Sequence, residues 1–103
     1  MMYQISEDRI RVRPEIRLGD KIYSVDNRLS TYRRISAGLE GQGVDELEVV
    51  LGEALGRQAY EEILGMDLSF AVMQEMVVIV LAAIQDLPLE EARRRFRGNG
   101  SGK

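Results

Sequence analysis

The sequence predicts an α+β domain in which an N-terminal β-hairpin is followed by a mostly α-helical bundle of four to five helices. Within residues 15–25, two β-rich runs flank a Gly-Asp pair, as two short strands joined by a tight turn do. From residue 29 onwards, apolar residues recur at the spacing of amphipathic helices. A chain of 103 residues is expected to form a single domain, here residues 1–97, with a disordered tail at residues 98–103.

The hairpin is predicted from a β-rich run on each side of Gly19-Asp20. Ile16 and Leu18 alternate with charged residues before this turn, and apolar residues resume after it. An isolated hairpin is only marginally stable, so we expect it to lie against a helix or against a strand of another chain. Apolar residues also alternate with arginines within residues 1–13, which fits either an edge strand or a flexible N-terminal arm.

Capping residues and glycines divide the rest of the chain into helices. Asp26 or Asn27 is expected to cap a first helix, which ends at the glycine-rich linker of residues 38–43. Asp45 is expected to cap a second helix, whose apolar residues match the amphipathic template and which Gly56 ends or kinks.

Apolar spacing supports these helices. Leu29, Tyr32 and Ile35 recur at helical spacing in the first of them. A shorter apolar stripe follows at residues 59–64 and is closed by Gly65, which is a preferred residue just past a helix end.

The longest predicted helix begins at Asp67 or Ser69 and runs to about residue 86. Residues 76–84 within it are all apolar, so the helix is apolar around its whole circumference and is expected to be buried on every side. It is either the centre of the bundle, which we place at residues 70–87, or it leaves one face for a partner. The apolar run is shorter than the ~20 residues that a membrane span needs.

Pro88 suits the first position of a last helix, which ends with the basic cluster Arg93–Arg97. Clustered arginines with an aromatic residue are typical of RNA-binding segments, but arginines also interact favourably with the dipole at a helix end. Glu90 and Glu91 precede two of these arginines by four residues and neutralise part of the charge. The cluster is therefore a solvated helix end, a basic surface for a protein, or a nucleic-acid contact.

Charge is distributed unevenly along the chain. The net charge is +2 over residues 1–43, −8 over residues 44–87 and +3 over residues 88–103. An acidic body between basic ends disfavours broad nucleic-acid binding by that body and favours pairing between chains or with a basic partner.

The composition excludes several kinds of chemistry. The chain contains neither Cys nor His, which removes the usual transition-metal ligands, thiol nucleophiles and His-based proton relays. Carboxylate pairs exist at Glu46/Glu48 and Glu61/Glu62, but they lie on the polar faces of the predicted helices instead of in an apolar pocket. We therefore expect no catalytic, cofactor-binding or metal-binding residue and no enzyme activity. Residues 1–10 contain no secretory apolar segment, so a cytoplasmic protein is expected.

The order of these elements carries a family resemblance. A hairpin and a Tyr-containing helix precede residues 50–64, which read Val-Leu-Gly-Glu-Ala-Leu-Gly-Arg-Gln-Ala-Tyr-Glu-Glu-Ile-Leu. An apolar helix that opens Asp-Leu-Ser-Phe, at residues 67–70, follows. Over residues 15–87 this order resembles the tail assembly chaperones of long-tailed bacteriophages.

The resemblance implies a non-catalytic scaffold. Chaperones of this family coat the long helical tape-measure protein, keep it soluble and help to recruit tail-tube subunits, and they self-associate. It would place this chain in the cytoplasm of the host cell, as a homo-oligomer with the tape-measure and tail-tube proteins as partners. The alternative function is a small nucleic-acid-binding regulator that uses the C-terminal Arg-rich helix.

The candidate residues for partner or self contact share apolar side chains on the predicted helices and are Leu51, Leu55, Tyr60, Met73, Met76 and Ile79. Methionine packs adaptably and is favoured on surfaces that repack around partners, although plain core packing uses it as well. Ile22 and Tyr23 of the hairpin form a second candidate surface, because an exposed strand edge can accept another strand.

Overall fold

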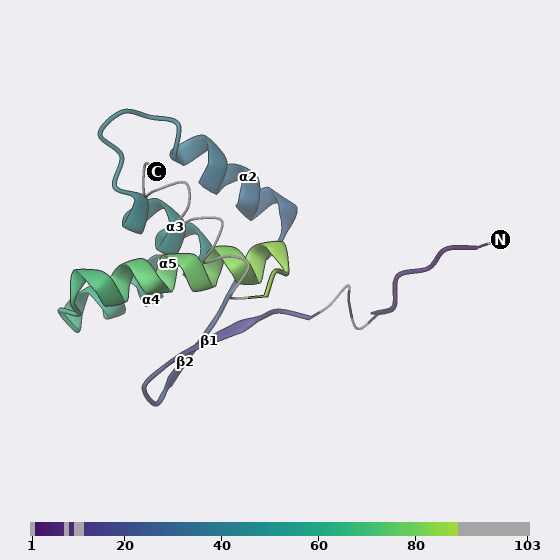
Figure 1. Cartoon of the computed structure of the whole chain (residues 1–103), viewed down its shortest axis with the longest axis horizontal. Coiled ribbons are helices and arrows are strands. Elements are labelled where there is room, and N and C mark those ends of the chain that lie inside the picture. Colours follow the sequence, from purple (N-terminus) through teal and green to yellow (C-terminus); the bar gives the residue numbers. More distant parts are fainter. Residues whose placement is uncertain (1, 8, 10–11, 89–103) are drawn as a thin grey trace.

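The computed structural model describes residues 2–7, 9 and 12–88 and confirms the α+β class (Figure 1). An antiparallel hairpin precedes four helices in this part of the chain. The elements are β1 (Glu15–Leu18), β2 (Lys21–Ser24), α2 (Leu29–Gly38), α3 (Glu46–Leu55), α4 (Arg57–Gly65) and α5 (Phe70–Gln85). Helix α3 contacts α2, α4 and α5, whereas α5 packs on α3 and β1. The centre of the described bundle is therefore α3, in place of the expected long apolar helix.

The hairpin turns at Gly19-Asp20, as predicted. Leu18 pairs with Lys21 across this two-residue loop. Gly19 has a φ of +65° and Asp20 does not have a positive φ, which matches a type II′ turn with glycine at its first central position. Ile16 of β1 is buried, because β1 packs against α5. The hairpin thus gains the helical support that its marginal stability requires.

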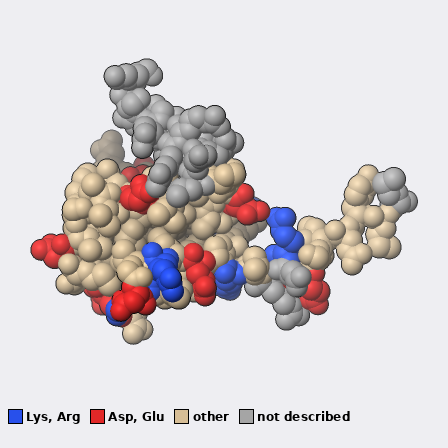
Figure 2. All heavy atoms as spheres, turned by 60° about the horizontal axis from the view of Figure 1, so that its bottom comes forward, with Lys and Arg blue, Asp and Glu red and all other residues tan. Residues whose placement is uncertain are grey.

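Charged side chains of both signs alternate along the side of the molecule that carries the hairpin (Figure 2). Lys21 of β2 lies 3.1 Å from the carboxylate of Glu62 in α4. Arg57 at the start of α4 lies 3.5 Å from Glu48 in α3. On the face that Figure 2 shows, basic groups are therefore interleaved with acidic ones and do not form a continuous basic surface.

Two of the predicted helix caps are confirmed. The Asp45 carboxylate accepts a backbone N–H two residues on at 3.0 Å, and the Ser69 hydroxyl accepts one three residues on at 3.2 Å. The predicted cap of α2 was wrong, because the N-cap residue is Arg28 and makes no side-chain capping bond. Asp26 lies two residues earlier and accepts the Arg28 backbone N–H at 3.2 Å, as an Asx turn does.

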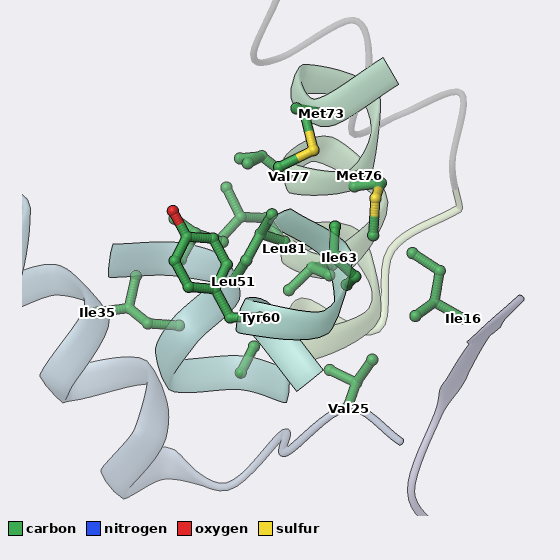
Figure 3. Close-up of a cluster of buried hydrophobic side chains, with 13 residues drawn as sticks. Ile16, Val25, Ile35, Leu51, Tyr60, Ile63, Met73, Met76, Val77 and Leu81 are labelled. Atoms are coloured by element: carbon green, nitrogen blue, oxygen red, sulfur yellow. The ribbon is translucent and has the colours of Figure 1, made fainter. Parts of the chain in front are cut away.

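The core lies where α3, α4 and α5 meet and is extended by Ile16 and Val25 from the hairpin side (Figure 3). Helix α5 contributes a buried side that includes Met76 and Val80. Its first turn is different, since Phe70 is 66% exposed and Val72 is 40% exposed. The all-apolar run, residues 76–84, is buried or partly buried throughout, whereas the elements that pack on this helix leave its first turn open within the described structure.

The described part of the first thirteen residues forms no strand and leads away from the body of the molecule (Figure 1). The hairpin pairing is nevertheless continued by one bond, in which the Val25 N–H donates to the Pro14 carbonyl at 2.9 Å. The predicted last helix with its Arg93–Arg97 cluster, and the predicted tail at residues 98–103, lie outside the described residues.

Candidate interaction surfaces

Four of the predicted contact residues lie in the core. Leu51, Tyr60, Met73 and Met76 are each between 0% and 6% exposed. Figure 3 shows their side chains directed into the space between α3, α4 and α5. Burial also raises the pKa of the Tyr60 hydroxyl, because the phenolate would lose its hydration there. In this structure these residues stabilise the fold, and their contact with a partner stays a prediction.

The other four candidates are more accessible. Leu55 and Ile79 are partly buried and pack against the core cluster. Ile22 and Tyr23 are neighbours in β2 and therefore point to opposite sides of the hairpin. Ile22 lies on the outer side and is 53% exposed, so the structure leaves it available to another chain.

Tyr23 is half-buried and joins the hairpin to α4. Its hydroxyl donates a hydrogen bond to Glu62 Oε1 at 2.7 Å, and the Lys21 ammonium donates to the same oxygen at 3.1 Å. The hydrogen bond from Tyr23 and then that from Lys21 lower the pKa of Glu62. The same hydrogen bond, with desolvation, raises the pKa of Tyr23 to about 12. This cluster holds the inner side of the hairpin in place.

The Tyr23–Glu62 hydrogen bond makes folding sensitive to alkaline pH. The pKa of Tyr23 is about 12 in the folded chain against an ordinary value of 10.0, so its contribution is fully present below pH 10.0 and is lost as pH rises towards 12. We expect Tyr23→Phe to be less stable than the wild type at neutral pH, and this difference to disappear through that window. Urea unfolding at a series of pH values measures it. A difference that stays constant across the window would contradict the proposed role of the bond.

Asp26 connects the hairpin, α2 and α3. Its backbone N–H donates to the Ala54 carbonyl at 2.8 Å, and its carboxylate accepts from the Arg28 guanidinium at 2.8 and 2.9 Å. The hydrogen bonds from Arg28 hold the pKa of this carboxyl well below its ordinary value, and a bond from buried Thr31 adds to the effect. Only 19% of the Asp26 side chain is exposed, so these partners replace the water that would otherwise stabilise its negative charge.

We expect Asp26→Asn to lower the free energy of unfolding by about 1–2 kcal/mol at neutral pH, because charge-assisted hydrogen bonds are lost. The pKa of Asp26 is lowered in the fold, so its contribution is present above the ordinary value of 3.8 and is lost as pH falls below it. The variant should therefore lose less stability on acidification than the wild type. Asp20→Asn, in the exposed turn, is the control, and an equal effect there would exclude a specific role for Asp26.

Helix α2 has an apolar stripe that the described chain does not cover. Leu29, Tyr32 and Ile35 share helical spacing, but only Ile35 is buried, and it is buried together with Thr31 on the side that faces α3. Leu29 is 61% exposed, Tyr32 39% and Leu39 36%. At 100° per residue these three side chains fall within one narrow sector of the helix. We call this set, Leu29, Tyr32 and Leu39, the α2 stripe.

The N-terminal residues include the most exposed large apolar side chains of the described chain. Met2 is 83% exposed, Tyr3 89% and Ile5 71%. They belong to a segment without helix or strand, residues 2–6, which we call the arm and which projects from the molecule (Figure 1). Sequence reasoning identified the alternation in this region but did not select these residues, because exposure cannot be read from the pattern.

The described residues carry carboxylates, the groups that metal binding or acid catalysis would use. They contain no group of three or more acidic residues that could hold a metal ion. The hydrogen bonds that lower the pKa of Glu62 have the opposite effect from the one that a general acid needs. Within residues 2–7, 9 and 12–88, no helix combines the length and hydropathy of a bilayer span.

The geometry thus defines a small α+β domain with exposed apolar groups on its arm, its hairpin and α2. Comparison of the chain with models of protein families, with curated proteins and with solved structures finds no match.

Proposed function

We propose that this chain is a non-catalytic chaperone of tail assembly in a long-tailed bacteriophage, which binds the tape-measure protein and helps to recruit tail-tube subunits. The order of hairpin, Tyr-containing helix and apolar helix at residues 70–85, on which the resemblance rests, supports this function. In this proposal the protein acts in the cytoplasm of the host cell and self-associates.

The observation that carries the proposal is the amount of large apolar surface that one copy leaves exposed. Ile22, Leu29 and Phe70 are each more than half exposed and come from three different elements, and the arm adds more. Burying one such side chain fully contributes about 1.5–3 kcal/mol, so covering several of them favours association with other chains. A chaperone that shields an apolar partner requires such surface.

The charge of the helical body favours a partner that is not strongly acidic. Residues 44–87 carry a net charge of −8, and these residues include α3, α4 and α5. An acidic surface attracts basic segments and repels the phosphate backbone of nucleic acids. Protein binding is therefore better supported than the alternative of nucleic-acid binding through the C-terminal arginines.

Co-expression with the tape-measure protein, which the proposal expects to be a very long helical protein encoded immediately downstream, tests the function. We expect the wild-type chain to keep that protein soluble and to co-purify with it. Ile22→Asp should weaken retention, because it replaces an exposed apolar side chain with a charge. Ser24→Asp adds the same charge on the same side of β2 without removing an apolar group and is the matched control. Failure of the wild type to retain the long protein, together with salt-sensitive binding to DNA or RNA, would contradict the proposal and favour the regulator.

A further inference from the structure

When the arm is extended, Tyr3 and Ile5 form its larger apolar side, and Met2 lies on the opposite side. Tyr3 and Ile5 alternate with Gln4 and Ser6, so in an extended segment the two apolar side chains point to the same side. Both are more than two-thirds exposed, and the segment leads away from its own body (Figure 1). The arm therefore presents an apolar edge that its own chain leaves uncovered in this structure.

The α2 stripe matches the arm in length and in charge. From Leu29 to Leu39 a helix rises about 15 Å, and the five extended residues of the arm span about 16 Å. Exposed Arg33 lies beside the stripe near its start, while the arm is followed in the sequence by Glu7, Asp8 and Arg9, which together carry a net negative charge. An arm laid along the stripe can thus bury apolar groups on both partners and bring opposite charges together.

We infer that the arm of one copy docks along the α2 stripe of a second copy, and that two copies exchange arms in a dimer. Reciprocal exchange buries the arm and the stripe of both copies and closes the assembly by two-fold symmetry. Burying Tyr3 and Ile5 against Leu29 and Tyr32 removes exposed apolar surface of both copies from water. The proposed function includes self-association, and this inference assigns that self-association a specific geometry. The inference therefore rests on the proposed function.

Light scattering coupled to size exclusion, over a range of concentrations, tests the exchange on the full chain. The wild type is expected to reach twice its 11.7 kDa. The arm variant Tyr3→Asp/Ile5→Asp and the stripe variant Leu29→Asp/Tyr32→Asp should each remain at the mass of one chain. Gln4→Asp/Ser6→Asp is the matched control, because it adds the same charges to the other side of the arm and should still dimerise.

Mixing the two monomeric variants provides a second test that does not depend on either variant alone. The stripe variant keeps an intact arm and the arm variant keeps an intact stripe, so an equimolar mixture should form a dimer with one interface. Circular dichroism of each variant establishes that it is folded. A monomeric wild type, dimers that persist in both variants, or a mixture of folded variants that stays monomeric would each overturn the inference.

The outcomes separate this inference from the proposed function. A wild-type chain that is monomeric but retains the tape-measure protein would overturn arm exchange and leave the chaperone function standing. A chain that dimerises through its arm but does not retain the tape-measure protein would overturn the chaperone function and leave arm exchange standing.

Discussion

Replacing Leu51 with alanine is expected to lower the free energy of unfolding by about 2–5 kcal/mol, because it opens a cavity in the core. Leu51 is 0% exposed and lies where α3 meets the other core helices (Figure 3). A loss of this size is a large fraction of the stability of a small domain. Urea unfolding followed by circular dichroism measures it.

The matched control is Leu64→Ala in α4, where the same side chain is 50% exposed. It should cost at most about 1 kcal/mol, because less apolar surface is returned to water. Both variants are compared at two protein concentrations, since self-association adds to apparent stability. If both variants lost the same free energy of unfolding, Leu51 would not be a core residue. It would then again be a candidate for contact with a partner.

Replacing Gly56 with alanine is expected to lower the free energy of unfolding by about 1–3 kcal/mol through the backbone alone. Gly56 joins α3 to α4 with φ +96° and ψ 154°, a conformation that residues with a Cβ rarely adopt. An added Cβ would meet no atom within 4 Å, so crowding is not the cause. The α3–α4 joint must therefore change its angle or accept the strain.

Gly52→Ala in the interior of α3 is the control with the opposite expected sign. Its backbone is helical and an added Cβ would also meet no atom within 4 Å, so alanine should raise the free energy of unfolding by about 0.5–1 kcal/mol. Thermal unfolding of both variants measures the contrast. If Gly56→Ala were as stable as Gly52→Ala, the left-handed joint between α3 and α4 would not be a requirement of the fold.

Features fixed by local chemistry could be predicted from the sequence. Gly19-Asp20 turns the hairpin, Asp45 and Ser69 cap their helices, and Gly56 ends α3 as expected. Each of these depends on the hydrogen-bonding capacity or backbone freedom of one or two residues, and the surrounding fold does not override it.

Features that depend on tertiary packing could not be predicted in the same way. Helical spacing placed Leu29, Tyr32 and Ile35 close together on α2, but it could not show that α3 would cover Ile35 and leave Leu29 exposed. Likewise, the all-apolar residues 76–84 of α5 are buried or partly buried, but their composition could not show that the first turn of the same helix would leave Phe70 exposed. The same reason explains why core residues, such as Leu51, were selected as contact candidates.

Hydroxyl-radical footprinting of the wild-type side chains tests most directly the division between residues that build the fold and residues that bind other chains. In a dilute sample, Tyr3 and Tyr32 are expected to be oxidised readily and Tyr60 and Met76 to be protected. In a concentrated sample, Tyr3 and Tyr32 should become protected as well, because a second copy covers them. Oxidation of Tyr60 and Met76 as fast as that of Tyr3, or no change at Tyr3 and Tyr32 on concentration, would contradict this division.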